Sequence, residues 1–161
     1  MKLIVVAVGH RMPSWVTAGF EDYARRMPRE ARLALSEVRP EPRGRADAGE
    51  ALRRLLEAER RRIATALPQG CRKVVLDEGG RSFTTRELAQ QLARWREGGR
   101  DVAFVIGSAD GTAPELRKEA DLVWSLSPLT LPHGLVRVLL AEQLYRACTI
   151  LAGHPYHRDG G

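Results

Sequence analysis

The stretch SPLTLPH, residues 127–133, leads directly into a long apolar segment that runs from Leu135 to Leu151. Two prolines restrict the backbone of the short stretch, because the pyrrolidine ring fixes the φ angle. The segment after it carries apolar residues on almost every side of a helical projection, which is typical of a buried helix. The sequence therefore predicts a rigid loop held against a buried helix, an arrangement suited to a binding site.

Length and charge limit what this site can be. The chain has 161 residues, of which 43% are hydrophobic, and we expect one globular domain over residues 1–161. The formal net charge is +6, and arginine carries almost all of the positive charge. Arginine pairs with phosphates and stacks on bases, so the charge favours an RNA or DNA partner. A biased genome composition explains the same arginine content, and composition alone leaves both readings open.

Other classes of site gain no support. Cys71 and Cys148 are too few and too far apart for a disulfide framework or a metal cluster, and we interpret each as a small buried side chain. The apolar run of residues 4–8 is too short for the core of a signal peptide, and no apolar stretch reaches transmembrane length. We expect a cytoplasmic protein without a metal or a membrane partner.

Strands and helices are expected to alternate along the chain, which is the pattern of an α/β fold. Residues 3–8 and 102–106 have the continuous apolar character of strands buried on both faces of a parallel sheet. Three further strands are expected at residues 31–38, 73–76 and 122–126.

Residues typical of helix N-termini precede the expected helices. Thr84 or Thr85 with Glu87 fits a capping box, and Asp47 with Glu50 fits a similar start for the preceding helix. The first helix is expected to begin with Ser14 as its N-cap, to end near Pro28, and to have a partly apolar face made of Trp15, Ala18, Phe20 and Tyr23.

The helix expected after Asp47 separates two kinds of side chain. Its inner face consists of Leu52, Leu55, Leu56, Glu59 and Ile63. Its arginines lie mostly outside this face, at positions 53, 54 and 60–62. These arginines either form a solvated face paired with Glu57 and Glu59 or contact RNA directly.

Three predicted loops follow strands and therefore meet at one edge of a parallel sheet. They are residues 76–80, which we interpret as a mobile turn, residues 107–111 and residues 127–133. Ligands enter α/β folds at the carboxyl ends of the strands, so these loops predict a pocket. The turn after the first strand lacks the glycine spacing of a dinucleotide site, and no phosphate-binding loop is present.

The terminal helix has more apolar surface than one sheet face can cover. Its polar exceptions are Arg137, Glu142, Gln143 and Arg146. We therefore infer that this helix contributes to a homodimer interface as well as to the core.

Five segments together resemble a known family. They are MKLIVVAVGH (residues 1–10), VVLDEGG (74–80), FVIGSADG (104–111), VWSLSPLTLPHGLVRVLLAEQLYRA (123–147) and HPYHR (154–158). The chain resembles the pseudouridine N3-methyltransferases of the ribosomal large subunit, which are minimal members of the SPOUT class. The resemblance covers essentially the whole chain.

The resemblance implies a SPOUT-type α/β knot, in which the C-terminal part of the chain forms a trefoil knot and binds S-adenosylmethionine, and it implies a homodimer. The cofactor positions it implies are Leu76, Gly107, Ser108, Ser127, Pro128, Leu129, Thr130, Leu131 and Pro132. Relatives usually have glycine where this chain has Ser108, and a side chain there either crowds the cofactor, if the turn requires a positive φ angle, or adds a hydrogen bond. Residues 159–161 extend beyond the usual end of the family.

The C-terminal tail supplies the candidates for chemistry and RNA contact. His157 matches the family motif and is our candidate for assisting removal of the proton from the acceptor nitrogen, since imidazole titrates near neutral pH. The alternative is that His154 and His157 only position RNA or pack the tail. The candidate RNA-binding residues are Arg137, Arg146, His154, Tyr156 and Arg158. Arg137 and Arg146 have the alternative of pairing with Glu142.

These observations predict an enzyme that uses S-adenosylmethionine to methylate N3 of a pseudouridine in 23S ribosomal RNA, on assembled ribosomes. The competing hypothesis is a non-enzymatic RNA-binding or ribosome-associated module with the same fold.

Overall fold

The computed structural model of the protein describes residues 1–44 and 49–158. Its strands are β1 (Leu3–Val8), β2 (Leu33–Val38), β3 (Arg72–Ser82), β4 (Val102–Ile106) and β5 (Leu122–Ser125). Its helices are α1 (Ser14–Arg26), α2 (Gly49–Ala66), α3 (Thr85–Glu97), α4 (Pro114–Lys118) and α5 (His133–Leu151). Two short 3-10 helices, η1 (Arg29–Ala31) and η2 (Pro155–Arg158), complete the described elements.

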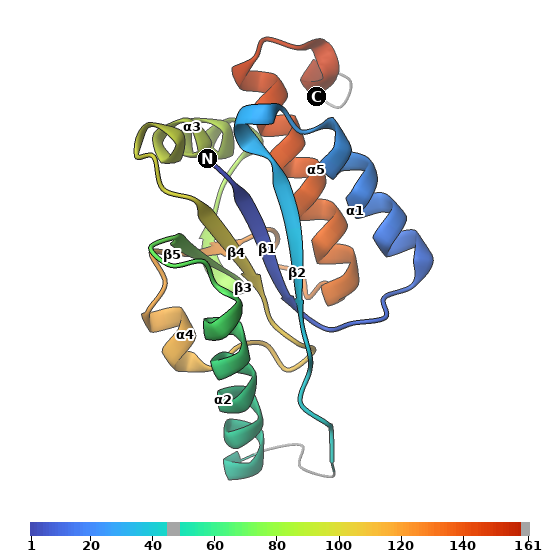
Figure 1. Cartoon of the computed structure of the whole chain (residues 1–161), viewed down its shortest axis with the longest axis vertical. Helices are drawn as coiled ribbons and strands as arrows, with labels where there is room; N and C mark the ends of the chain where they lie inside the picture. Colours follow the sequence, from blue (N-terminus) through green and yellow to red (C-terminus); the bar gives the residue numbers. More distant parts are fainter. Residues whose placement is uncertain (45–48, 159–161) are drawn as a thin grey trace.

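The strands form one parallel sheet in the order β2-β1-β4-β3-β5. Helices α1, α3 and α5 contribute to the apolar cluster on one face of the sheet, and α2 and α4 contribute to the cluster on the other (Figure 1). The predicted α/β fold with a parallel sheet is confirmed.

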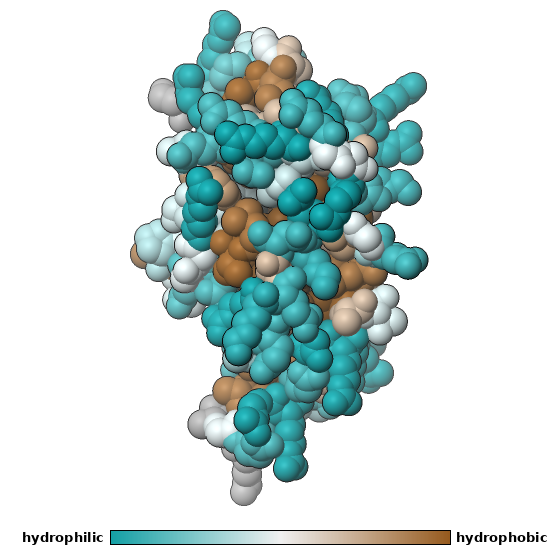
Figure 2. Space-filling model, turned by 90° about the vertical axis from the view of Figure 1, so that its left-hand side faces the viewer, coloured by the Kyte–Doolittle hydropathy of each residue, from teal (hydrophilic) through white to brown (hydrophobic). Residues whose placement is uncertain are grey.

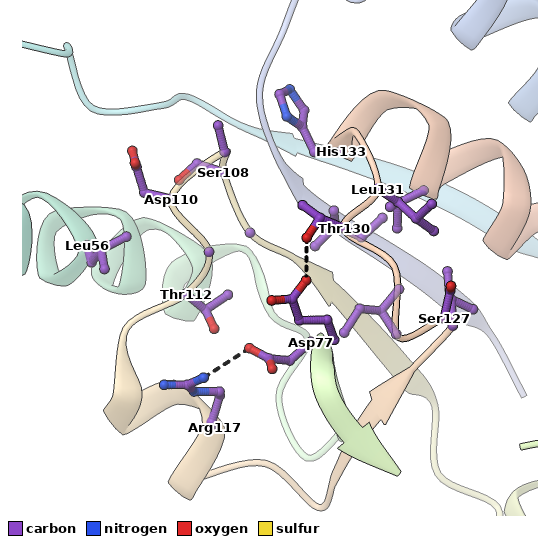
Figure 3. A pocket seen from close by; sticks show the side chains of 18 of the residues that line it. Leu56, Asp77, Ser108, Asp110, Thr112, Arg117, Ser127, Thr130, Leu131 and His133 are labelled. Atoms are coloured by element: carbon purple, nitrogen blue, oxygen red, sulfur yellow. Dashed lines mark hydrogen bonds and ion pairs between the residues drawn. The ribbon is translucent and has the colours of Figure 1, made fainter. Parts of the chain in front are cut away.

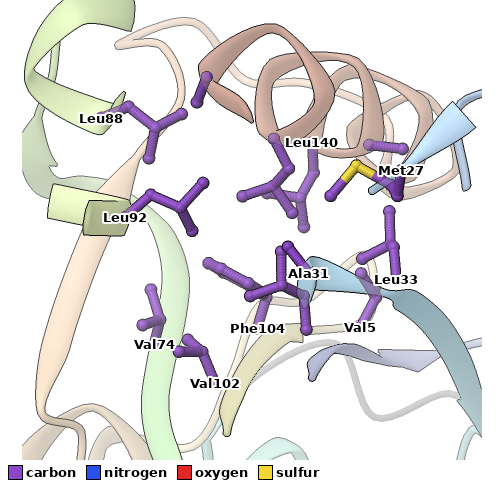
Figure 4. Packing of buried hydrophobic residues seen from close by; sticks show 14 of the residues in the cluster. Val5, Met27, Ala31, Leu33, Val74, Leu88, Leu92, Val102, Phe104 and Leu140 are labelled. Carbon is purple, nitrogen blue, oxygen red and sulfur yellow. The ribbon is translucent and has the colours of Figure 1, made fainter. Parts of the chain in front are cut away.

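The apolar patterns of the strands explain why both faces are covered. Side chains alternate along a strand, so Leu3, Val5 and Ala7 of β1 face the cluster with α5, whereas Val6 and Val8 face the cluster with α2. All of β4 is buried. Figure 4 shows the larger cluster, in which strand and helix side chains meet. Full burial of one such leucine or phenylalanine contributes about 1.5–3 kcal/mol.

The predicted start of α3 is confirmed, whereas the predicted start of α1 is wrong. The capping box of α3 is confirmed, because Thr84 accepts a hydrogen bond from the Glu87 amide while the Glu87 carboxylate accepts one from the Thr84 amide. Ser14 was expected to cap α1, and this is wrong: Ser14 is the first helical residue, and Pro13 precedes it without a side-chain cap bond. Asp47, expected at the start of α2, lies outside the described residues.

The buried face of α1 also differs from the expectation. Val16 and Phe20, four residues apart, are buried, whereas Trp15 is 57% exposed and Ala18 is exposed. In α2 the expected inner face is confirmed for Leu55, Leu56, Glu59 and Ile63, all of which are buried.

Strand β3 does not end at Leu76 in a mobile turn, as the sequence predicted, but continues to Ser82. Leu76 and Arg81 both pair with Trp124 of β5, so residues 77–80 form a bulge without partners in β5. Gly80 brings the two backbones together: a Cβ atom at this position would lie 2.7 Å from the carbonyl carbon of Val123.

We predict that Gly80→Ala lowers the free energy of unfolding by about 1–3 kcal/mol, because overpacking a rigid contact forces the backbones apart. Gly79→Ala is the matched control, since a Cβ there would meet only the flexible carboxylate of Asp77. Urea unfolding of both variants measures the difference. Equal losses would contradict the proposed backbone contact.

Candidate functional site

A cavity of about 530 Å³ lies between the bulge of β3 and the carboxyl ends of β4 and β5. Its volume falls within the range of about 300–1,000 Å³ that is typical of small-molecule sites. The neighbouring strands β3 and β4 lead to helices on opposite faces of the sheet, α3 and α4 respectively. The cavity therefore lies at a topological switch point, where α/β sheets bind ligands.

The three loops predicted from the strand order line this cavity (Figure 3). Most of the predicted cofactor positions are among the lining residues, namely Leu76, Gly107, Ser108, Ser127, Leu129, Thr130 and Leu131. Pro128 and Pro132 are exposed and do not belong to the lining. Pro132 instead precedes the first turn of α5, where its carbonyl accepts the hydrogen bond of the Val136 amide.

The loop of residues 127–131 is held by hydrogen bonds of its own and by the β3 bulge. Ser127 Oγ accepts from the Leu129 amide at 3.0 Å, and Ser125 Oγ donates to the Ser127 carbonyl at 2.9 Å. Thr130 Oγ1 donates to the Glu78 carboxylate at 2.8 Å. The loop is therefore shaped without using the apolar side chain of Leu129, which is 70% exposed.

The turn after β4 is closed tightly on itself. A Cβ atom on Gly107 would overlap the carbonyl group of Gly111, and Ser108 forms an isolated bridge with Gly111. Ser108 does not have a positive φ angle, so its side chain causes no backbone strain. Its hydroxyl donates to Glu59 at 2.9 Å. Of the two consequences considered for a serine at this position, the additional hydrogen bond is present.

Four polar residues that line the cavity were not predicted as site residues. Asp77 and Glu78 lie in the β3 bulge, Thr112 follows the β4 turn, and Arg117 on α4 donates to Asp77 at 3.0 Å. The side-chain oxygen of Thr112 is buried and has no partner among the described residues. Asp77 and Glu78 lie within the predicted loop of residues 76–80, and Thr112 directly follows the loop of residues 107–111, so the loops themselves were the available signal.

His133 lines the cavity at the start of α5. Burial lowers the pKa of His133, and the guanidinium groups of Arg137 and Arg43 lower it further. The neutral imidazole is therefore favoured at this edge of the cavity.

Arg137 is buried and does not lie on an RNA-facing surface, so its assignment as an RNA-binding residue is wrong. The residue is 1% exposed. Its guanidinium donates to the Gly9 carbonyl at 3.0 Å and to Glu37 at 2.8 Å, which stabilises the buried charge. The alternative pairing with Glu142 applies only to Arg146, whose Nε donates to that carboxylate at 2.7 Å.

The tail is docked on the end of α5 that lies away from the cavity (Figure 1). The Tyr156 hydroxyl donates to Glu142 at 3.2 Å, and its ring packs edge-on against Tyr145 with centroids 4.7 Å apart. The Arg146 guanidinium lies over the same ring, 4.8 Å from its centroid. His154 and Arg158 are exposed, whereas His157 is half-buried.

The arginines at positions 53, 54, 60 and 61 of α2 form ion pairs with glutamates of the same helix, as expected for a solvated face. Arg53 and Arg54 pair with Glu50, and Arg60 and Arg61 pair with Glu57. Glu59 does not take part in this exposed array, because it is buried and pairs with Arg43.

A membrane-spanning helix and a metal-binding cluster are both absent from the described residues. No helix in residues 1–44 and 49–158 is both long and apolar enough to cross a membrane. The same residues contain no group of three or more histidine, cysteine or acidic side chains placed to hold a metal ion.

The three-layer fold with a switch-point cavity defines an α/β protein with a small-molecule site. A family model described as "Predicted SPOUT methyltransferase" matches residues 1–157, and the chain belongs to the SPOUT methyltransferase family. Two curated relatives, from Burkholderia multivorans (strain ATCC 17616 / 249) and Nitrosospira multiformis (strain ATCC 25196 / NCIMB 11849 / C 71), are both named Ribosomal RNA large subunit methyltransferase H. Each is 56% identical over 158 residues, which cover 98% of this chain and 99% of the relative. The resemblance inferred from the motifs is confirmed.

A solved structure of a probable methylase family protein from Haemophilus influenzae Rd KW20 has a similar fold. Its TM-score is 0.51 with 14% sequence identity, and the match covers 96% of this chain and 69% of that one.

The lowered pKa of His133 predicts a pH dependence of stability. The unfolded chain binds the histidine proton near the usual pKa of 6.5, whereas the folded protein binds it only at lower pH. The contribution of neutral His133 is therefore present above pH 6.5 and is lost as the pH falls through the lowered pKa. We expect His133→Asn to flatten the dependence of the free energy of unfolding on pH below 6.5. Urea unfolding at a series of pH values tests this, and identical slopes for both proteins would contradict it.

Proposed function

We propose that this protein methylates N3 of a pseudouridine in 23S ribosomal RNA of the large subunit, with S-adenosylmethionine as methyl donor and the assembled ribosome as substrate. The observation that carries the proposal is the switch-point cavity, in which three strand-end loops bring together most of the family's cofactor positions. The names of the relatives that match along nearly the whole chain indicate the substrate class.

The residues of the cavity fit S-adenosylmethionine. Leu76, Ile106 and Leu126 give it apolar surface for the adenine and the methionine chain, and the free hydroxyl of Thr112 offers a hydrogen bond. The carboxylates of Asp77, Glu78 and Asp110 also line it and favour a ligand with a sulfonium and an ammonium group. The cofactor supplies a methyl group that is activated by the positive sulfur.

The knot of the SPOUT class belongs to the same proposal. The loop of residues 127–131 contacts the β3 bulge through Thr130 and Glu78, and it shares the cavity with the turn after β4. Beyond this loop the chain enters α5, on the opposite face of the sheet from α4. We propose that this passage threads the C-terminal segment through the chain that precedes it. A threaded loop has fewer conformations available, and the cavity is therefore ordered before the cofactor binds.

A homodimer gives the tail access to a cavity. Helix α5 has 19 residues, so its two ends are separated by roughly 28 Å. The cavity adjoins His133 at one end, whereas the tail leaves the helix at the other end and is held by Tyr156 against Glu142, midway along α5. We therefore propose that the tail of one subunit serves the cavity of its partner, with apolar parts of α5 in the interface.

The chemistry requires orientation and the loss of one proton. The N3 nitrogen of pseudouridine carries a hydrogen, which leaves as the nitrogen forms its bond to the methyl group. Holding the nitrogen in line with the methyl group is the main contribution of the protein, since correct placement removes much of the entropic barrier. We propose that His157 of the tail assists the proton transfer.

The tail also supplies the exposed groups for RNA contact. His154 and Arg158 are exposed, whereas Arg146 and Tyr156 already contact Glu142 and each other. The latter two therefore hold the tail, and the former two are the better candidates for contacting RNA. Hydrophilic side chains also cover most of the surface around α3, β5 and α4 (Figure 2).

Isothermal calorimetry with S-adenosylmethionine tests the cofactor assignment. We expect saturable binding, and we expect Gly107→Ala to weaken it at least about tenfold, because the closed turn has no room for a Cβ atom. Gly98→Ala, at the end of α3 and remote from the cavity, is the control and is expected to bind normally. Absence of binding by the unaltered protein would overturn the enzyme proposal and favour the RNA-binding module.

Mixed dimers test the arrangement of the tail. One differently tagged subunit carries Gly107→Ala and the other carries His157→Ala, and the purified mixed dimer is assayed for methyl transfer to ribosomes. If the tail acts on the partner, the intact cavity receives an intact tail, and about half of the normal activity is expected. Each variant alone is expected to retain little activity, with His157→Ala leaving cofactor affinity nearly unchanged. A mixed dimer as inactive as its parents would contradict this arrangement.

A further inference from the structure

Glu59 is a charged residue in an otherwise apolar layer. It lies on the inner face of α2, one turn from Leu55 and Leu56 and one turn from Ile63, and it is 2% exposed. Burying a carboxylate is costly unless hydrogen bonds and opposite charge replace the lost water. The partners of Glu59 therefore indicate why a charge is kept at this position.

The two carboxylate oxygens of Glu59 bind two different segments. Oε2 accepts from the Ser108 hydroxyl at 2.9 Å, in the turn that lines the cavity. Oε1 accepts from Arg43 Nη1 at 2.9 Å and from the Glu41 amide at 3.0 Å. Both of the latter belong to residues 39–44, which follow β2 and which we call the β2 strap. Glu59 thus joins the cavity turn to the β2 strap.

Arg43 connects the same two segments a second time. Its Nε lies 2.9 Å from Asp110 Oδ2, so the guanidinium bridges the buried carboxylate of Glu59 and the exposed end of the cavity turn. Arg62 of α2 holds the other end of the strap, by donating to the Arg39 carbonyl at 2.9 Å and pairing with Glu41 at 2.6 Å. The turn of residues 107–111 is therefore fixed at Ser108 and at Asp110 by one network.

We infer that Glu59 is a positioning residue for the cofactor, which holds the turn of residues 107–111 in its binding conformation through Ser108 and, by way of Arg43, through Asp110. Glu59 itself is not among the residues that line the cavity. When the hydrogen bonds of Glu59 are removed, the turn samples other conformations, and only a fraction of the molecules can bind the cofactor. The apparent cofactor affinity falls in proportion to that fraction. The inference rests on the proposed function for the identity of the ligand.

The network acts on the turn more than on the fold. Ile63 packs α2 against the sheet, and Leu55 and Leu56 pack against Ala113 at the start of α4, so the apolar packing of α2 does not require Glu59. Glu59→Gln keeps the shape of the side chain, and the charge that it leaves behind, on Arg43, still has Asp110 and water as partners. Asp110 and Arg43 are each more than one third exposed, so the outer half of the network lies at the surface.

The test combines Glu59→Gln, Ser108→Ala and the double variant, with the affinity for S-adenosylmethionine measured by calorimetry. Each single change is expected to weaken binding about tenfold, and the double change little more than either single change, because both break the same connection. At saturating cofactor, kcat is expected to stay close to normal while the KM for S-adenosylmethionine rises. Arg43→Gln alters the exposed side of the network and is also expected to weaken cofactor binding. Because Arg43 lies outside the core, this variant tests the network without changing a core residue.

Glu57→Gln is the matched control, since Glu57 lies on the same helix but pairs with Arg60 and Arg61 away from the turn. It is expected to leave cofactor affinity unchanged. If the unaltered protein binds no S-adenosylmethionine, the proposed function itself fails. If it binds but Glu59→Gln and Ser108→Ala bind equally well, or if their losses simply add, the positioning role is overturned. A parallel loss of kcat and of the free energy of unfolding would likewise overturn it, as it would indicate a purely structural role.

Discussion

The close approach of two backbones at Gly80 is the constraint on which the cavity depends. Because this position lacks a side chain, β3 lies directly against Val123 and Trp124 of β5 even after its bulge has broken the regular pairing. The bulge projects Asp77 and Glu78 into the cavity, and Glu78 in turn holds Thr130 of the loop after β5. A local departure from regular strand geometry therefore positions two of the three walls.

Helix α5 is tied to the protein by polar contacts at two places along its length, although most of its surface is apolar. Near its start, the buried guanidinium of Arg137 binds Gly9 and Glu37 at the ends of β1 and β2. At its middle, Glu142 accepts from Arg146 and from Tyr156 of the tail. Apolar packing alone has little directional preference, whereas these hydrogen bonds fix the rotation and height of the helix. Arg137 therefore fixes α5 against β1 and β2, and Glu142 fixes the tail against α5.

The sequence predicted most elements of the fold because their patterns are local. Strand periodicity and the capping box of Thr84 and Glu87 depend on neighbours only a few residues away, and both are confirmed. The bulge was misread as a turn because Asp-Glu-Gly-Gly is a typical turn composition, and only the contact with β5, more than forty residues later, keeps it extended. Arg137 was misassigned for the same reason: its partners Gly9 and Glu37 are distant in sequence, and an arginine on a helix is more often solvated.

Two buried charges, Glu59 and Arg137, lie on helices that cover opposite faces of the sheet, and they have a common physical role. Each lies on a helix that packs against the sheet, and each uses its hydrogen bonds to fix segments at the carboxyl ends of the strands. A buried charge is costly to leave unpaired, so the segment that satisfies it is held more firmly than an apolar contact would hold it. These segments are thereby held from the side that faces away from the cavity. Side chains such as Leu76, Leu129 and Thr112 therefore remain available to a ligand. A site ordered in this way loses little conformational entropy when a ligand binds, which suits a reaction whose main requirement is the placement of two reacting atoms.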